Sequence, residues 1–267
     1  MIITRADIVE AIKRSGIAGE VVCLHSSLRS FGEVAGGADT VVGAFLNAGC
    51  TLLAPSFTED FQIPPPEEIE RNGWEPGEDC FTPNGRIYEP GVTDIDDDMG
   101  AIPRAMINTA GRHRGYHPTN SFVALGSKSE RLAVCQTPGN VYGPFQEAMD
   151  ERGYIVMAGV DLTKMTAIHY AEQLSGRELF VRWALDCQGV PMRIRVGSCS
   201  NGFNNLLPTV AALEKRVLVG GSLWRVFPFF ETVHACTEAI RKEPGVTHCG
   251  KLDCARCNDI VRGGPIL

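Results

Sequence analysis

The sequence lacks the apolar run of roughly 18–20 residues that a membrane-spanning helix needs. It also lacks an excess of basic residues, because 25 Lys and Arg stand against 32 Asp and Glu, a net charge of −7. A phosphate backbone is bound through basic side chains, so a nucleic-acid partner is not expected, whereas a cationic small molecule would be attracted. The N-terminal residues have no apolar core of a secretory signal. We therefore expect a cytoplasmic protein with neither a membrane nor a nucleic-acid partner.

Nucleotide-binding glycine motifs are missing as well, since Gly36-Gly37 fits neither a phosphate-binding loop nor a dinucleotide fingerprint. What is present is an ordinary globular composition, with 44% hydrophobic and 21% charged residues in 267. Ten cysteines in a chain of the reducing cytoplasm indicate thiols, metal ligands or core residues rather than disulfides. No repeat or linker divides the sequence, and we expect one domain over residues 1–267.

Helix and strand patterns alternate in the first 57 residues, which favours an α/β fold with a partly parallel sheet. Thr4, with Asp7 three residues later, predicts the start of the first helix, and Gly16 its end. Further strands are expected at 21–25, 51–57, 121–126 and 154–160, helices at 36–49, 101–111 and 166–176, a β-hairpin at 179–196, and two helices within 203–243.

Residues 58–99 interrupt this alternation with prolines and many acids, against which only Arg71 and Arg86 are basic. An irregular segment of this length inside a compact domain is more often functional than idle. One interpretation is a solvated loop. The other is an acidic wall of a cleft, in which Glu59 and Asp60 contact a polycationic substrate.

A strand pattern ends in His25-Ser26-Ser27-Leu28. Serine hydroxyls and free backbone N–H groups at the end of a strand suit phosphate or pantetheine oxygens. The alternative is a plain turn, in which Ser26 and Ser27 cap the local backbone.

Two further segments carry histidines. His117 precedes Pro118, which holds it extended, so its imidazole is either a general base or a structural hydrogen-bonding group. His169 and Glu172 lie three residues apart on one face of a predicted helix. Glu172 either orients His169 or reaches His117 across a cleft, or the pair belongs to a solvated polar face.

The C-terminal segment at 248–257 is rich in cysteine. Cys249, Cys254 and Cys257, with Cys199 as the fourth ligand, match the donor set of a structural zinc ion. Four protein ligands leave no open position for a catalytic water. The alternative is a set of reduced surface thiols.

The segments HSSLRSFGEVAGGADTVVGAFLNAGCTLLAPSF, HPTNS, GYIVMAGV and TAIHYAE, in this order, resemble the aminoglycoside 3-N-acetyltransferases, which are distinct from the GNAT acetyltransferases. The resemblance implies an α/β fold of three layers, with a central mixed β-sheet flanked by helices. It implies acetyl-coenzyme A as the acetyl donor and a primary amine, the 3-amino group of an aminoglycoside antibiotic, as the acceptor. Resistance to such antibiotics would follow.

The same resemblance implies roles for individual residues. His117 would be the base, with Glu172, or more weakly Asp98, as its carboxylate partner. Thr166 would join His25, Ser26, Ser27 and Leu28 at the coenzyme, and His169 would join Glu59 and Asp60 at the substrate. The alternatives are a transferase of the same fold with another amine acceptor, a hydrolase that uses a histidine and a carboxylate, and a non-catalytic binder. A homodimer is one alternative for the oligomeric state.

Overall fold

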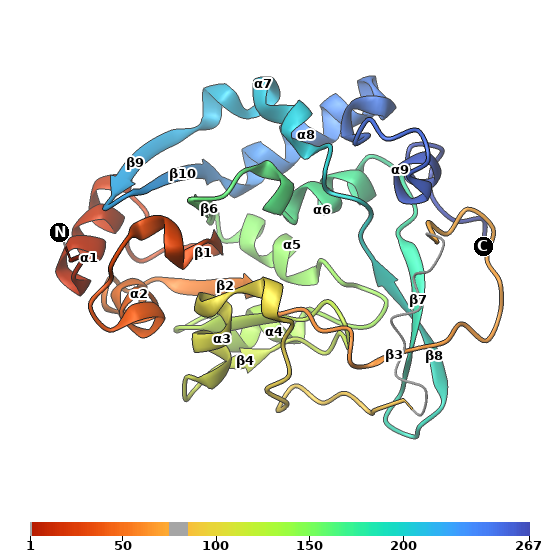
Figure 1. The fold of residues 1–267 in the computed structure, drawn as a ribbon, viewed down its shortest axis with the longest axis horizontal. Coiled ribbons are helices and arrows are strands. Elements are labelled where there is room, and N and C mark those ends of the chain that lie inside the picture. Colours follow the sequence, from red (N-terminus) through yellow and green to blue (C-terminus); the bar gives the residue numbers. More distant parts are fainter. Residues whose placement is uncertain (1, 75–84) are drawn as a thin grey trace.

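The computed structural model describes residues 2–74 and 85–267, so Glu78 and Asp79 of the acid-rich segment lie outside the described residues. At its centre is a mixed seven-stranded sheet of order β4-β5-β2-β1-β6-β10-β9 (Figure 1). Strands β2, β1 and β6 are parallel, and the neighbours on both sides are antiparallel. The strands are β1 (Val21–Ser26), β2 (Thr51–Pro55), β4 (His113–Arg114), β5 (Phe122–Leu125), β6 (Tyr154–Ala158), β9 (Lys215–Val219) and β10 (Ser222–Pro228).

Helices cover both faces of this sheet, which confirms the predicted three-layer α/β arrangement. Alternate residues of β1 point to opposite layers: Val22 and Leu24 join the core under α1, α2 and α3, and Val21 and Cys23 the core under α4, α5, α6 and α8. None of the helices in the described ranges is both long and apolar enough to cross a bilayer. The helices are α1 (Arg5–Ser15), α2 (Gly37–Asn47), α3 (Ala101–Asn108), α4 (Ser129–Val134), α5 (Gly143–Asp150), α6 (Ala167–Leu174), α7 (Leu207–Val210), α8 (Phe229–Lys242) and α9 (Ala255–Ile260).

The predicted ends of α1 are confirmed. Thr4 and Asp7 form a reciprocal capping box, in which the Thr4 N–H donates to Asp7 Oδ2 at 2.8 Å. Gly16 ends the helix with φ of 81°, a left-handed conformation that glycine adopts without steric cost.

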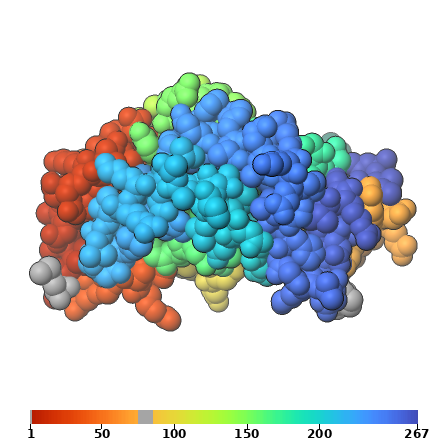
Figure 2. All heavy atoms as spheres, turned by 90° about the horizontal axis from the view of Figure 1, so that it is seen from above, coloured from red at the N-terminus to blue at the C-terminus, as the bar shows by residue number. Residues whose placement is uncertain are grey.

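A second, three-stranded sheet stands at the other end of the molecule from α1 (Figure 1). Its strands are β3 (Gln62–Ile63), β7 (Phe180–Leu185) and β8 (Pro191–Val196), and β7 and β8 form the predicted hairpin. The C-terminal segment lies against residues near 70, as Figure 2 shows. There, the Ile266 N–H donates to Glu70 O at 3.0 Å, and the Gly73 N–H donates to Asp259 Oδ2 at 2.8 Å.

Two helices do form within 203–243, the short α7 and the longer α8, but they do not fill this range. Residues 215–228 between them form the β9–β10 hairpin around Gly220-Gly221, which was not predicted. The alternation of Val217 with Val219, and of Trp224 with Val226, is the strand signal. The hairpin extends the central sheet through the antiparallel pairing of β10 with β6, and the buried Trp224 stacks on Phe45 of α2, with 5.4 Å between ring centroids.

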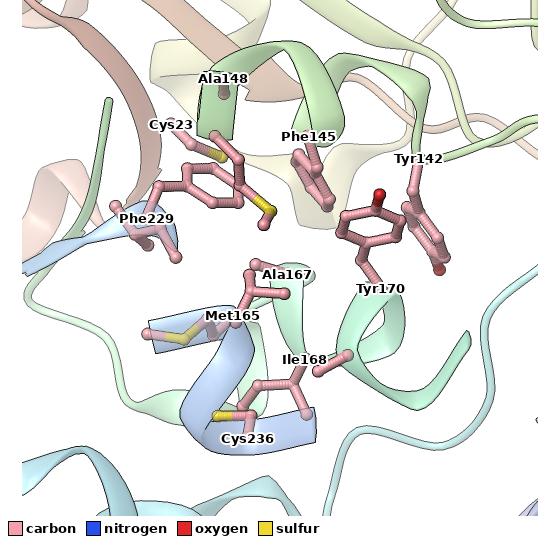
Figure 3. Packing of buried hydrophobic residues seen from close by; sticks show 14 of the residues in the cluster. Cys23, Tyr142, Phe145, Ala148, Met165, Ala167, Ile168, Tyr170, Phe229 and Cys236 are labelled. Carbon is pink, nitrogen blue, oxygen red and sulfur yellow. The ribbon is translucent and has the colours of Figure 1, made fainter. Parts of the chain in front are cut away.

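One aromatic group of the core supports α6, the helix that carries His169 and Glu172. Tyr142, Phe145 and Tyr170 face one another between α5 and α6 (Figure 3). The Tyr142 and Phe145 rings are stacked 5.5 Å apart, and Tyr142 and Tyr170 lie 6.1 Å apart. The start of α6 is therefore held against a rigid layer, which fixes the direction of its side chains.

Candidate active site

A cavity opens at the carboxyl ends of the parallel strands. It encloses about 340 Å³. His25 and Ser26 end β1, Pro55 ends β2, and Val160 follows β6, and all four residues line it. This edge is where open α/β sheets bind their ligands, because the loops after parallel strands meet there.

His169 lines this cavity, and its Nδ1 lies 2.9 Å from Glu172 Oε2. Both side chains come from α6, three residues apart, so the predicted shared face brings them together. The hydrogen bond to Glu172 uses Nδ1 and leaves Nε2 as the ring nitrogen available to a ligand. A carboxylate behind an imidazole fixes its tautomer and stabilises its protonated form, so this pair is built for proton transfer.

Glu172 is 1% exposed and lies beneath His169 rather than on the cavity wall. Burial raises the pKa of Glu172, but its hydrogen bond to His169 and the positive charge of Arg177 outweigh burial, so the pKa lies below its usual value. Each carboxylate oxygen has two partners. Oε1 accepts from Arg177 Nη1 at 2.5 Å and Thr247 Oγ1 at 3.0 Å, and Oε2 accepts from Ser198 Oγ at 2.8 Å besides His169.

Aromatic rings and a glycine hold the His169 ring from its sides. The Tyr142 ring is nearly parallel to it at 6.5 Å, and the Phe203 ring meets it edge-on at 4.7 Å. Gly197 lies directly against the His169 and Tyr142 rings, since a Cβ there would be 2.8 Å from His169 Cγ and 2.6 Å from Tyr142 Oη. A side chain at this position would have to displace one of the two rings, so glycine allows the backbone to pack closely on His169.

His117, the residue expected to be the base, lies away from the cavity. His117 is fully buried and, among the described residues, does not line the cavity. Its Nδ1 accepts from the Asn120 N–H at 2.9 Å, and its Nε2 donates to Arg195 O at 2.8 Å. Burial lowers the pKa of His117 to about 4. With both nitrogens engaged, His117 joins its own turn to β8, and Glu172 serves His169 instead.

The acid-rich segment does form one wall of the cavity, with Glu59, Asp96 and Asp98 lining it. Burial, together with the charges of Glu59, Asp98 and Asp60, raises the pKa of Asp96 above its usual value, despite a hydrogen bond from the Glu59 N–H. A cation placed at this wall would relieve that repulsion. Asp98 belongs to the wall, because Glu172 already occupies Nδ1 of His169.

Other acids of the segment have arginine partners. Asp94 Oδ1 lies 2.8 Å from Arg86 Nη1, and Asp97 Oδ1 lies 2.8 Å from Arg104 Nη2. Asp60, expected at the substrate, is exposed, lies 3.6 Å from Arg86, and is absent from the described residues that line the cavity. The negative charge that faces the cavity is therefore smaller than the sequence suggests.

In the segment His25–Leu28, the first two residues line the cavity and the last two do not. Burial lowers the pKa of His25 to about 3, so its imidazole is neutral. Ser26 Oγ is buried and has no hydrogen-bond partner among the described residues, although Ser26 lines the cavity. Ser27 and Leu28 are not among the described lining residues. The Ser27 N–H donates to Ala158 O, and Leu28 packs on the core under α1, α2 and α3. Thr166 lines the cavity.

Several site residues escaped sequence analysis. Tyr142, Gly197 and Ser198 come from loops, and Arg177 reaches Glu172 from beyond the end of α6. Arg182 also lines the cavity, with its guanidinium 3.9 Å from the Trp74 ring centroid. Arg177 lies shortly before β7, and Arg182 lies within it. An arginine within an apolar strand is the sequence signal that could have indicated Arg182.

The four cysteines predicted as metal ligands come together. The Sγ atoms of Cys199, Cys249, Cys254 and Cys257 all lie within 4.8 Å of one another. A tetrahedral zinc site with Zn–S bonds of about 2.3 Å sets its sulfurs about 3.8 Å apart. The four thiols thus match the number, type and approximate spacing of donors that zinc requires.

Comparison with known proteins identifies relatives of this chain. The family model of aminoglycoside 3-N-acetyltransferases matches residues 23–201. Aminoglycoside N(3)-acetyltransferase IX of Micromonospora chalcea is 29% identical over 181 residues, which cover 65% of this chain and 63% of that protein. Aminoglycoside N(3)-acetyltransferase III of a Salmonella species is 28% identical over 185 residues, covering 64% and 61%. The matched region spans less than two thirds of these curated relatives.

Solved structures share the fold over most of their length. The aminoglycoside acetyltransferase AAC(3)-IVa apoenzyme superposes with a TM-score of 0.79 over 98% of both chains, at 18% identity. AAC-IIIb in a binary complex with CoASH gives a TM-score of 0.74 over 91% of this chain and 97% of that one, at 20% identity. An AAC(3)-IVa mutant in complex with apramycin gives a TM-score of 0.73 over 94% of this chain and 98% of that one, at 19% identity.

Proposed function

The chain belongs to the aminoglycoside 3-N-acetyltransferase family, and from this premise we propose that it transfers the acetyl group of acetyl-coenzyme A to the 3-amino group of an aminoglycoside. The observation that carries the proposal is the His169–Glu172 pair at a cavity whose other wall is acidic. An amine acceptor needs both a base that removes its proton and negative charge that holds its remaining ammonium groups. The relatives' activity supports the choice of reaction.

His169 acts as the base in this proposal. An amine is mostly protonated at neutral pH, so its lone pair attacks only after a proton has been removed. Nε2 of His169 accepts that proton, and Glu172 stabilises the resulting imidazolium through Nδ1. Glu59, Asp96 and Asp98 attract and orient the other ammonium groups of the acceptor.

Acetyl-coenzyme A supplies the acetyl group as a thioester. The C–N bond forms as the C–S bond breaks, the imidazolium of His169 returns one proton to the departing thiolate, and the second proton that the amine loses passes to solvent. The unpartnered hydroxyl of Ser26 is a donor for the negative charge that develops on the thioester oxygen, and Thr166 is a second hydroxyl on the same cavity. A buried hydroxyl without a partner fits a site that is completed by a ligand.

We also propose that the four-cysteine cluster holds a structural zinc ion. Its four thiols satisfy a tetrahedral ion completely, so the ion would stabilise the C-terminal segment without binding water or substrate. Cys199 would join the segment after β8 to the segment that precedes and begins α9.

The test of the proposed reaction is release of free coenzyme A thiol from acetyl-coenzyme A, measured over a panel of amines. We expect turnover with aminoglycosides, acetylation at the 3-amino group by NMR of the product, and no turnover with neutral sugars. Thiol release that is independent of any amine would instead identify a hydrolase. Turnover with simple amines but not with aminoglycosides would show that the reaction is acetyl transfer to a different class of amine.

A further inference from the structure

The four-cysteine cluster joins two segments that are distant in sequence and that both contact the catalytic pair. Cys199 lies in the stretch between β8 and the 3-10 turn Phe203–Leu206, and the other three cysteines lie at 249–257. Residues 197–200 pair with no strand in the described part of the chain. Their position therefore depends on side-chain contacts, of which Cys199 provides one.

Each segment supplies one hydroxyl to Glu172, and each hydroxyl takes a different oxygen. Ser198, next to Cys199, donates to Oε2 at 2.8 Å, and Thr247, two residues before Cys249, donates to Oε1 at 3.0 Å. Thr247 also accepts from Arg177 Nη1 at 2.8 Å. Thr247 and Glu172 are both 1% exposed, so no bulk water replaces a lost Thr247 hydroxyl.

Short chain distances couple these hydroxyls to the thiols. Consecutive Cα atoms are 3.8 Å apart, so a displacement of Cys199 is carried directly to Ser198. The 246–248 turn has other supports, because Asn205 Nδ2 donates to Val246 O at 3.0 Å and His248 O at 3.2 Å. Release of the cluster should therefore move Ser198 more than Thr247.

We propose that zinc bound by Cys199, Cys249, Cys254 and Cys257 positions the catalytic carboxylate, through the hydroxyls of Ser198 and Thr247. Both are positioning residues: they act on Glu172, which in turn orients His169. The inference rests on the proposed acetyl transfer for its kinetic readout. It predicts that loss of the metal lowers kcat as well as stability, whereas a merely structural ion would act on stability alone.

The first arm of the test keeps the metal and removes the hydroxyls. Ser198→Ala and Thr247→Val are each expected to lower kcat about 10-fold or more, since each deletes a hydrogen bond to a buried charge. KM for acetyl-coenzyme A should stay within about twofold. Ser198→Thr and Thr247→Ser retain the hydroxyl and should recover most of kcat. Ser15→Ala is the matched control, because Ser15 is buried and its hydroxyl donates to Ile12 O at 2.7 Å within α1.

The second arm removes the metal from the full-length protein with a chelator and restores it with zinc alone. Purified protein should contain about one zinc per chain. Metal removal should lower wild-type kcat, but should change kcat of the Ser198→Ala/Thr247→Val double variant much less, because effects that act through one contact are not additive. Thermal unfolding should shift in both proteins. The NMR signal of the His169 Nδ1 proton should shift on metal removal, a readout independent of acetyl transfer.

Several results would overturn the inference: purified protein without metal, metal-free protein with wild-type kcat, or an equal loss of kcat in the wild type and the double variant. If the metal-free protein unfolds, the test rests on the metal-loaded Ser198→Ala and Thr247→Val variants. A wild-type kcat in both variants would reject the inference. A wild type that transfers no acetyl group defeats the proposed function instead, and the NMR signal then tests the positioning alone.

Discussion

Gly197→Ala should impair catalysis, because its methyl group would occupy space next to His169, the proposed base. The new Cβ would lie 2.8 Å from His169 Cγ and 2.6 Å from Tyr142 Oη, whereas ordinary contacts begin at 3.4 Å. The imidazole must retreat by about 0.6 Å, and since a misplacement of about 1 Å costs up to about 10²-fold in rate, we expect kcat to fall about 10- to 100-fold. Tyr142 is packed against Phe145 and cannot absorb the whole displacement.

The assay is steady-state acetyl transfer with both substrates varied, together with thermal unfolding. Gly139→Ala is the matched control, because a Cβ at Gly139 meets no atom within 4 Å and its φ is not in the left-handed region. The control should keep kcat within about twofold of the wild type. A Gly197→Ala protein with wild-type kcat would show that the position of the His169 ring does not limit the reaction.

Two further predictions concern charge. Burial lowers the pKa of His117 to about 4, against about 6.5 in an unfolded chain. The unfolded state therefore binds a proton that the folded state does not, and stability should fall from about pH 6.5 to 4, by up to about 3 kcal/mol from this residue. Urea unfolding at both pH values should show a smaller acid loss for His117→Gln, and an unchanged loss would refute this origin. At the acidic wall, Glu59→Gln with Asp98→Asn should lower kcat/KM for the aminoglycoside at low salt and flatten its salt dependence, because screening weakens such attraction. Asp94→Asn, whose carboxylate pairs with Arg86, is the control, and equal salt slopes in all three proteins would remove the wall from acceptor binding.

Local signals in the sequence predicted much of the fold. Thr4 and Gly16 bound the first helix because capping is decided by neighbouring residues. The β9–β10 hairpin was missed, although two glycines between alternating apolar residues are a hairpin signal. The apolar residues of 203–243 fit a helical period nearly as well as a strand period, and the contact of Trp224 with Phe45 that decides between them is long-range.

The sequence identified several residues of the candidate site, but not how the fold arranges them. The i, i+3 spacing places His169 beside Glu172 from the sequence alone. The sequence does not show that His117 is buried with Arg195 O as a partner, since that carbonyl comes from a strand 78 residues away. The proximity of the four cysteine thiols could be predicted because three of them are close in sequence.

The central claim is that His169, and not His117, is the base. Its most direct test is kcat for acetyl transfer in His169→Ala and His117→Ala, each checked for folding by circular dichroism. We predict that His169→Ala loses about 10²–10⁴-fold in kcat, the usual range for a lost general base, and remains folded. His117→Ala should lose stability and keep most of its kcat at a temperature where it is folded. The reverse result, a folded His117→Ala protein without turnover and an active His169→Ala protein, would contradict the account.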